Sequence, residues 1–592
     1  MDYPNAGLKA QIEKEIRDYL TKEVNLSQDV SFSQAKLVRR IALFESKTYP
    51  NGKFDAAGDY KFWFDIISPR VEAEIKNIDF DTKNILVYSD GKSDQLPDAI
   101  SNLKLKEYLR TTGQAEEINS TIEEGAGWGN FVEKKVKGGY ERIDLRNFYV
   151  INQTARTLDE SPAIERHELS QSDLREKIGL YKNVEEVIKG CKQNSYAPTA
   201  ETQSEETTTP YYEIYERNGE VCVADLMIEA GKEPTETDKN EYVLAKVVCA
   251  AVKSSGNGTN SVEIKYILYA EKLTKKMSDI YKEYHRGRYK GRWFREGLYE
   301  LLFDIQVRSN QIGNQLSKGL EWASKTIFYS PDKLLVQNIL TDLKNGDIIK
   351  AAQLAHVPVR MDGFDQLVAD WNRLIQMAND IANSREVVQG ITPPSGTPLG
   401  TTALLNQNAN KLFDFIREKL AIPFSEMFEE WIVPDLISDL KTKEILRLTG
   451  DSDMLGRLQE WVVNDWYLNN LFNIGPHTKE IADNLKAEKL EELKAKPELL
   501  MNGLENAFEG YKPRVSIIIT GENSKIPELL NSYSIFIPLE VDPIRRQALI
   551  ENAMRLQGID VGSLPKSAPE ALTPPPSLSP TRPTTPRTAN AV

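Results

Sequence analysis

Glycine-rich motifs are one place where this sequence could carry phosphate chemistry, because a loop of backbone N–H groups can hold a phosphate. Gly125, Gly127 and Gly129 form a GxGxG pattern. A dinucleotide-binding loop needs a different spacing to its third glycine and lies between a strand and a helix, whereas this segment lies between a predicted helix and a predicted hairpin. No GxxxxGK[ST] pattern occurs. We interpret the three glycines as a corner between a helix and a strand.

Metal or nucleophile chemistry would need clustered histidines, cysteines or acids. The histidines have no HExxH or HxH spacing, and each is interpreted as a surface or interface residue. They are His167, His285, His356 and His477. The acids Glu123–Glu124 and Asp451 with Asp453 could form a metal cluster, but in a chain with 88 acids chance proximity explains them. Without a GxSxG elbow either, the sequence predicts no enzyme, no metal and no cofactor.

The densest group of basic residues lies between Lys265 and Arg295. Basic residues interleaved with aromatic rings are typical of nucleic-acid surfaces. The predicted docking or DNA patch consists of Lys275, Lys276, Lys282, Arg286, Arg288, Lys290 and Arg292. The interleaved rings are Tyr281, Tyr284, Tyr289 and Trp293. A solvated face, or an interface with an acidic neighbouring subunit, explains the same pattern, and both alternatives stay open.

Length and charge limit the class of protein. A chain of 592 residues suggests about two to four folding units. Acids exceed bases by 88 to 74, leaving a net charge of −14, which argues against tight wrapping of nucleic acid but not against handling DNA without gripping it. We expect a soluble protein of intracellular origin, since the sequence has no signal-peptide pattern and no apolar run of about 18 residues. We also expect reduced thiols at Cys191, Cys222 and Cys249, which form no CxxC pair.

The first half of the chain is predicted to mix helices with strands. Apolar periodicity predicts helices at 8–22 and 33–46, and the aromatic-rich segment 60–80 is expected to pack into a first core. A hairpin is predicted across 131–143, with its turn at Gly138-Gly139. Two short helices are expected at 168–192. A mostly β insertion follows at 211–270, and its first hairpin is predicted to turn at Asn218-Gly219.

The second half is predicted to be mainly helical. A 3.5-residue apolar repeat over 298–323 predicts a helix roughly 40 Å long. A second helix is predicted at 362–384, then a Pro/Gly-rich loop, and a third helix from about 401 with a kink at Pro423. A strand is expected at 514–520 and a helix at 542–558. The last 30 residues are rich in proline, serine and threonine and are expected to be disordered.

The order of these parts resembles that of tailed-bacteriophage portal proteins, over roughly residues 60–440. The resemblance rests on EEGAGWGNFVEKKV followed by GGYERIDLRNFYVINQTAR, on GRWFREGLYELLFDIQVRSNQIGNQL, and on GITPPSGTPLGTTALLNQNANKLFDFIREKL. The first pair of segments resembles the helix, glycine corner and strand of portal proteins. The second segment resembles their glycine-led helix that carries a Gln and an Asn. The third resembles their Ser-Gly-Thr segment, which leads into a long helix. The sequence resembles most the portals of crAss-like phages of gut bacteria.

The resemblance implies a helix-rich α+β fold with the portal parts wing, stem, clip, tunnel loop and crown. The implied layout is an α/β wing at 1–165, candidate descending stem helices and a linker at 166–198, a mostly β clip at 199–290, a stem helix at 291–330, wing with tunnel helices and a tunnel loop (385–400) at 331–441, a helical wing region with a returning strand at 442–541, a crown-like helix at 542–562 and a disordered Pro/Thr-rich tail at 563–592. The candidate DNA-facing residues of the tunnel loop are Arg385, Glu386, Gln389, Thr392, Ser395 and Thr397.

As a function, the resemblance implies a dodecameric ring at one capsid vertex, which is the channel for genome packaging and ejection. The implied partners are further copies of the chain, double-stranded DNA, the major capsid protein, the large terminase during packaging and head–tail adaptor proteins, with no membrane. Such a protein is assembled in the host cytoplasm and is part of the virion. The alternative is another virion scaffold or connector without a DNA channel, and an enzyme is the third candidate.

Overall fold

All described residues belong to one of the two compact units of the chain. The units are Met1–Ile519 and Thr520–Val592. The computed structural model describes residues 7–49, 52–54, 58–80, 82, 85–89, 95–191, 193–194, 210–254, 261–324, 327–329, 355–357, 363–382, 399–438, 440, 456, 459–460, 462–464, 466–467, 470, 479–495, 508 and 511–517. The expected crown-like helix and the Pro/Thr-rich tail lie outside these residues, as does the tunnel loop up to residue 398.

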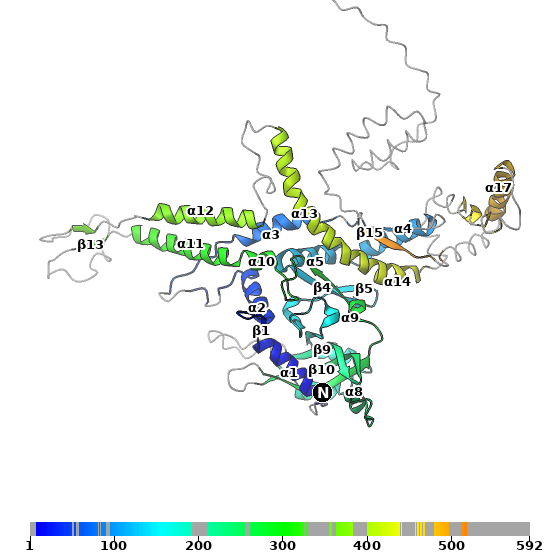
Figure 1. The fold of residues 1–592 in the computed structure, drawn as a ribbon, viewed down its shortest axis with the longest axis horizontal. Helices are drawn as coiled ribbons and strands as arrows, with labels where there is room; N and C mark the ends of the chain where they lie inside the picture. Colours follow the sequence, from blue (N-terminus) through cyan, green and yellow to red (C-terminus); the bar gives the residue numbers. More distant parts are fainter. Residues whose placement is uncertain are drawn as a thin grey trace, which may run out of the picture. The chain divides into compact units, whose positions relative to one another are not determined.

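Helices and sheets are mixed in the described unit, which confirms the α+β class (Figure 1). Its largest sheet is antiparallel with the order β11-β10-β9-β7-β6, and β8 pairs with β9. These strands are β6 (Phe148–Val150), β7 (Ala163–Leu169), β8 (Gln193–Asn194), β9 (Pro210–Cys222), β10 (Tyr242–Ser254) and β11 (Ser261–Lys272). Among the helices that pack on the sheet are α1 (Gly7–Thr21), α6 (Gln171–Glu176) and α7 (Val184–Gly190).

Both faces of this sheet are buried. Successive residues of a strand point to opposite faces, so Val247 of β10 packs in one core with Ile12 and Ile16 of α1. Val248 packs in another core with Leu174 of α6 and side chains of α7. The predicted first helix and the predicted pair of short helices are thereby confirmed. The first helix packs on one face of the large sheet, and the two short helices pack on the other face.

The hairpin predicted to turn at Asn218-Gly219 is wrong. β9 runs through both residues, and both pair with β10. A Cβ on Gly219 would lie 2.6 Å from the Cβ of Pro162, so this glycine permits close packing within a strand rather than a turn. In place of the predicted second strand, Val223–Glu229 forms the helix α8.

Strand pairing joins segments that the implied layout separated. The boundary expected between 165 and 166 falls inside β7, because β7 pairs with β9 from Ala163 to Leu169. At the other end, β12 (Tyr281–His285), expected in the clip, pairs with β4 (Asn130–Val136), expected in the wing. The two expected regions therefore share their sheets.

The remaining strands form smaller sheets. The order β12-β4-β5 is a three-stranded sheet. The pairing of Val136 with Gly139 confirms the predicted hairpin, but its turn residues are Lys137 and Gly138, one residue earlier than predicted. β15 likewise confirms the strand predicted from Arg514. The strands not yet given are β1 (Val24–Ser27), β2 (Val30–Phe32), β3 (Ile85–Tyr88), β5 (Gly139–Arg142), β13 (Ile327–Tyr329), β14 (Ala355–Val357) and β15 (Arg514–Ile517). They pair as β1-β2, β3-β15 and β13-β14.

The largest core lies among helices far apart in the sequence. Phe131 of β4, Leu298, Leu374 and Phe424 are all buried in it. The helices not yet given are α2 (Gln34–Glu45), α3 (Ile67–Ile78), α4 (Gln95–Thr111), α5 (Gln114–Trp128), α9 (Met277–Ile280), α10 (Leu298–Leu301), α11 (Phe303–Ser324), α12 (Phe364–Ile381), α13 (Leu399–Met427), a π-helix (Phe428–Ile432), α14 (Val433–Ser438) and α17 (Lys479–Ala495), with 3₁₀ turns at Leu145–Asn147 and Leu158–Glu160. Several of these helices enclose the largest core, while α9 and α17 do not contribute to it. α13 continues past Pro423, and α11 and α12 pack side by side (Figure 1).

A row of side-chain amides on α11 fixes the aromatic-rich segment expected in the first core. The helix predicted over 298–323 is interrupted at Leu302. Beyond it, alternate backbone N–H groups of residues 62–66 donate to the side-chain oxygens of Gln306, Asn310 and Asn314 at 2.8–2.9 Å. Helix residues four apart are about 6 Å apart along the axis, and alternate residues of an extended chain about 6.6 Å. Because the repeats nearly match, the amides act as a partner strand.

Candidate functional site

Three residues of the predicted basic patch form ion pairs inside the protein. Lys282 Nζ lies 2.6 Å from a carboxylate oxygen of Glu430. Arg286 makes two bonds to Glu74, of 2.6 and 2.8 Å. Arg292 donates to both oxygens of Glu300 at 2.8 Å. These side chains are mostly buried, so their expected role as exposed docking residues is corrected.

The aromatic part of the pattern is likewise mostly internal. Tyr281, Tyr284 and Trp293 are buried in the cores, so they are not available for stacking on nucleic acid. Tyr289 is 38% exposed. Lys275, Lys276, Arg288 and Lys290 are exposed, and among them Lys290 pairs with Glu296.

A second ionic group, which sequence analysis missed, lies between the large sheet and the three-stranded sheet. Lys134 Nζ of β4 lies 2.7 Å from carboxylate oxygens of both Glu165 and Glu216, and Lys246 lies 2.9 Å from Glu216. The Tyr281 hydroxyl donates to Glu165. Burial alone would raise the pKa of Glu216, but the two lysines outweigh it and hold that pKa at about 2. This buried network joins the two sheets.

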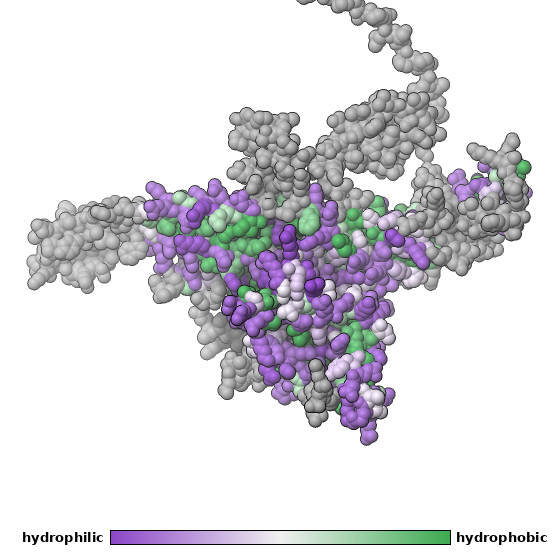
Figure 2. Space-filling view, in the orientation of Figure 1, coloured by the Kyte–Doolittle hydropathy of each residue, from purple (hydrophilic) through white to green (hydrophobic). Residues whose placement is uncertain are grey.

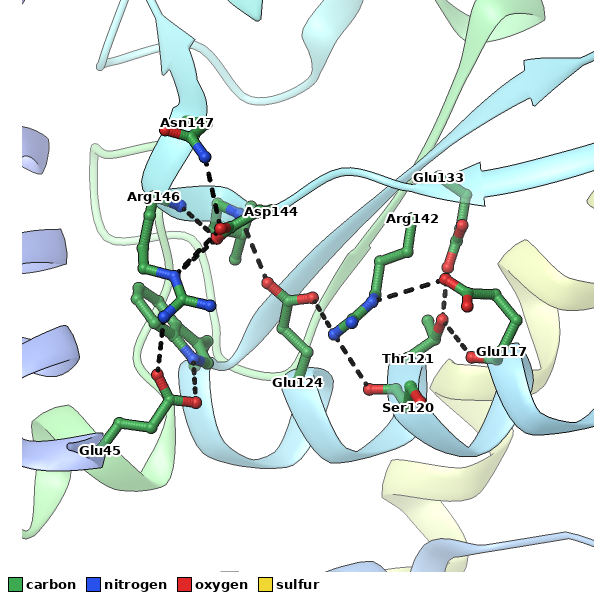
Figure 3. Close-up of polar contacts among 12 residues, drawn as sticks. Glu45, Glu117, Ser120, Thr121, Glu124, Glu133, Arg142, Asp144, Arg146 and Asn147 are labelled. Carbon is green, nitrogen blue, oxygen red and sulfur yellow. Dashed lines mark hydrogen bonds and ion pairs between the residues drawn. The ribbon is translucent and has the colours of Figure 1, made fainter. Parts of the chain in front are cut away.

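A group of buried carboxyls lies where α5 packs against the β4–β5 hairpin (Figure 3). Arg142 donates to Glu124 at 2.8 Å, yet burial and the nearby Asp144 raise the pKa of Glu124 to about 7. Glu133 is fully buried. One of its oxygens accepts a 2.5 Å bond from Thr121, and the other has no hydrogen-bond partner. Burial raises the pKa of Glu133 well above its ordinary value.

We expect Glu133→Gln to stabilise the protein at pH 7 by on the order of 1 kcal/mol, because folding then no longer buries or protonates a carboxylate. A raised pKa in the folded state means that the neutral acid stabilises the fold below pH 4.5 and that this stabilisation is lost as the pH rises above 4.5. Tm measured from pH 4 to pH 7 should therefore separate the variant from the wild type only toward pH 7. The exposed neighbour Glu123, changed to Gln, is the control, and an equal effect there would contradict the assignment.

The glycines of the GxGxG pattern pack against other parts of the chain. Gly129 ends α5 with φ +80°, and a Cβ on it would lie 2.4 Å from the backbone nitrogen of Gly297. A Cβ on Gly127 would lie 2.4 Å from the ring of Tyr299. The interpretation as a corner is confirmed, since two backbones meet where only glycine fits.

The described histidines and cysteines lie among protein groups and do not form a metal site. His285 is largely buried, and its ring contacts Asn130 and Glu283, so its interpretation as a surface residue is wrong; His167 is partly exposed. The side chain of His356, and all of His477, lie outside the described residues. The three cysteines are buried and free. Within the described ranges, no group of three or more His, Cys, Asp or Glu could hold a metal ion.

Large apolar side chains are exposed on three successive long helices. Figure 2 shows apolar surface over α11 and α12. The residues, between 38% and 58% exposed, are Leu320 of α11, Val368, Met377 and Ile381 of α12, and Phe415 and Ile422 of α13. A contiguous apolar area, such as the one over α11 and α12 in Figure 2, is typical of a surface that another protein covers. The expected DNA-facing residues between α12 and α13, Arg385 to Thr397, lie outside the described residues.

The comparisons with known proteins give no family. No helix in the described part of the chain is long and apolar enough to cross a membrane. No protein-family model matches the sequence, and no curated protein matches it significantly.

Proposed function

We propose that this chain is a portal subunit of a tailed bacteriophage. In this proposal twelve copies form a ring at one capsid vertex, and the genome passes through the ring during packaging and ejection. The large terminase and head–tail adaptors dock on the ring, and the major capsid protein surrounds it. The proposal that the chain is a portal subunit comes from the sequence resemblance. The exposed apolar residues and the net charge support ring formation and a channel for DNA.

The exposed apolar side chains of α11, α12 and α13 are the observation that carries the proposal. Their burial against a neighbouring copy would gain about 25 cal/mol for each Å² removed from water. A surface of this kind that meets a different surface on the next copy makes a head-to-tail contact. Such contacts form a ring when the rotation from copy to copy closes, and an open filament when it does not. The three helices are also those on which the resemblance to portal stem and tunnel helices rests.

The charge of the chain supports a channel that does not grip DNA. Each copy carries −14, and a ring multiplies this charge. A negative channel wall repels phosphate, which favours sliding over tight binding. Another virion scaffold or connector without a DNA channel is the second candidate, because exposed apolar helices fit any assembly.

Ring formation should depend on the exposed apolar residues. We expect Met377→Glu to lower the fraction of rings at least tenfold, because it places a charge in the buried interface, while the circular dichroism of the chain stays unchanged. Gln376→Glu adds the same charge at the adjacent exposed position of α12 and should assemble normally. Native mass spectrometry measures both. If the Met377 variant still forms intact rings, α12 is not part of the interface between copies.

A further inference from the structure

We propose that Arg156 and Arg295, which contact the ring of Tyr289, together with Arg288 and the nearby Lys419, form a binding site for the phosphodiester backbone of double-stranded DNA. The site differs from the predicted patch, whose Lys282, Arg286 and Arg292 are used in internal ion pairs. The choice of duplex DNA as the ligand rests on the proposed function. The site itself rests on contacts of the described residues.

Tyr289 is the centre of this cation cluster. Its hydroxyl donates to the carbonyl oxygen of Thr154 at 2.7 Å, which fixes the ring. The guanidinium carbons of Arg156 and Arg295 lie 5.5 and 5.6 Å from the ring centroid, within cation–π distance. The two arginines are therefore held by one partly exposed ring.

Lys419 of α13 adds a third positive charge to the same place. Its Nζ donates to the carbonyl oxygen of Arg286 at 3.2 Å. Burial lowers the pKa of Lys419, and so do the charges of Arg295 and Arg288. Mutual repulsion of this kind occurs where cations are crowded, and an anion would relieve it.

Two of the arginines have guanidinium donors that no described residue uses, and those of Arg288 are on the surface. The Nε atom of Arg295 is buried without a hydrogen-bond partner, although an Nη atom donates to the carbonyl oxygen of Arg156 at 3.2 Å. Arg288 is exposed and forms no ion pair or hydrogen bond with the described residues. Arginine presents a planar set of donors that fits phosphate oxygens.

The neighbouring acids already have other partners. Glu283 accepts from the indole nitrogen of Trp293 at 2.6 Å and from the backbone nitrogen of Leu158 at 3.0 Å. Glu160 accepts from the backbone nitrogen of Arg156 at 2.8 Å. These two carboxylates therefore have donors other than the four cation side chains, and none of the four cations forms an ion pair with a described carboxylate.

Nucleic acid fits the cluster better than an acidic peptide does. Arginine binds phosphate oxygens through a planar set of donors, and the Tyr289 ring holds two of these arginines in place. Duplex DNA carries about one charge per 1.7 Å of its axis, so several phosphates pass a cluster of this size. A contact of a few cations binds weakly and depends strongly on salt, which a sliding duplex tolerates.

Binding of the full-length protein to a fluorescent 30-base-pair duplex, measured over a series of salt concentrations, tests the site. We expect Arg288→Gln/Lys419→Gln to weaken binding at least tenfold at low salt and to reduce the salt slope by about 1.8, since each phosphate contact contributes about 0.9. Arg288→Gln alone, which removes an exposed side chain, should reduce the slope by about half as much. Lys272→Gln/Lys275→Gln removes two charges from exposed residues outside the cluster and should change binding less than twofold.

Three results would overturn the site. These are the absence of duplex binding by the wild type at low salt, an equal loss in the control variant, and retention of duplex binding by the cluster variants. Loss of binding to poly-glutamate instead of DNA would replace the phosphodiester ligand with an acidic protein segment. Native mass spectra of the same samples separate this test from the proposed function, because rings without cluster-dependent binding would contradict only the site.

Discussion

Lys134→Met is expected to destabilise the protein by about 3–5 kcal/mol, because it removes the cation shared by two buried carboxylates. Glu165 and Glu216 both lie 2.7 Å from Lys134 Nζ, and their side chains are 3% and 9% exposed. Lys246 still pairs with Glu216 in the variant, so Glu165 is the carboxylate that loses its lysine partner. Hydrogen exchange of β7 and β9 should accelerate by about a hundredfold or more, since each 1.4 kcal/mol is a factor of ten.

The pH dependence gives this prediction a second test. The pKa of Glu216 is held at about 2, below its value in the unfolded chain, so the ion pair stabilises the fold above pH 4.5 and this stabilisation is lost as the pH falls toward 2. The gap between wild type and variant should therefore shrink on acidification. Lys137→Met, at an exposed residue next to the hairpin turn, should cost less than about 0.5 kcal/mol. A similar Tm for all three proteins would contradict the role of Lys134.

Gly129→Ala is expected to destabilise the protein by about 2–5 kcal/mol, the sum of left-handed backbone strain and backbone overlap. The new Cβ would lie 2.4 Å from the nitrogen of Gly297, and neither backbone can rotate away as a side chain would. The corner joins α5, β4 and the start of α10, so thermal unfolding should report the loss directly.

Gly138→Ala is the matched control for the corner. Gly138 also has a positive φ, +84°, but nothing lies within 4 Å of its Cβ position. Its substitution should cost only about 1–2 kcal/mol of strain. Equal destabilisation by both substitutions would mean that the close approach of Gly297 contributes nothing.

Local features of the fold were predictable because their causes are local. Ile12 and Ile16 lie one turn apart on α1, and the apolar spacing alone places them on one buried face. The hairpin turn at Lys137-Gly138 has a local cause, because Gly138 takes a positive φ of +84° that glycine adopts readily. The Asn218-Gly219 prediction failed for the opposite reason. β10 pairs with both residues and Pro162 packs against Gly219, and these tertiary contacts outweigh the turn preference.

The role of the basic residues could not be predicted from the sequence. Glu74 lies 212 residues from Arg286, and Glu430 lies 148 residues from Lys282. No periodicity links such positions, so a run of cations looks the same whether it faces solvent or its own acids. The surviving cation cluster gathers Arg156 and Lys419 from outside the run, which only the fold brings together.

Negative-stain electron microscopy of the purified full-length protein, with native mass measured on the same sample, tests the central claim most directly. The portal proposal predicts rings with a central hole and a mass of about twelve copies. A homogeneous monomer or dimer, even when the capsid protein and adaptors of the same phage are present, would contradict it.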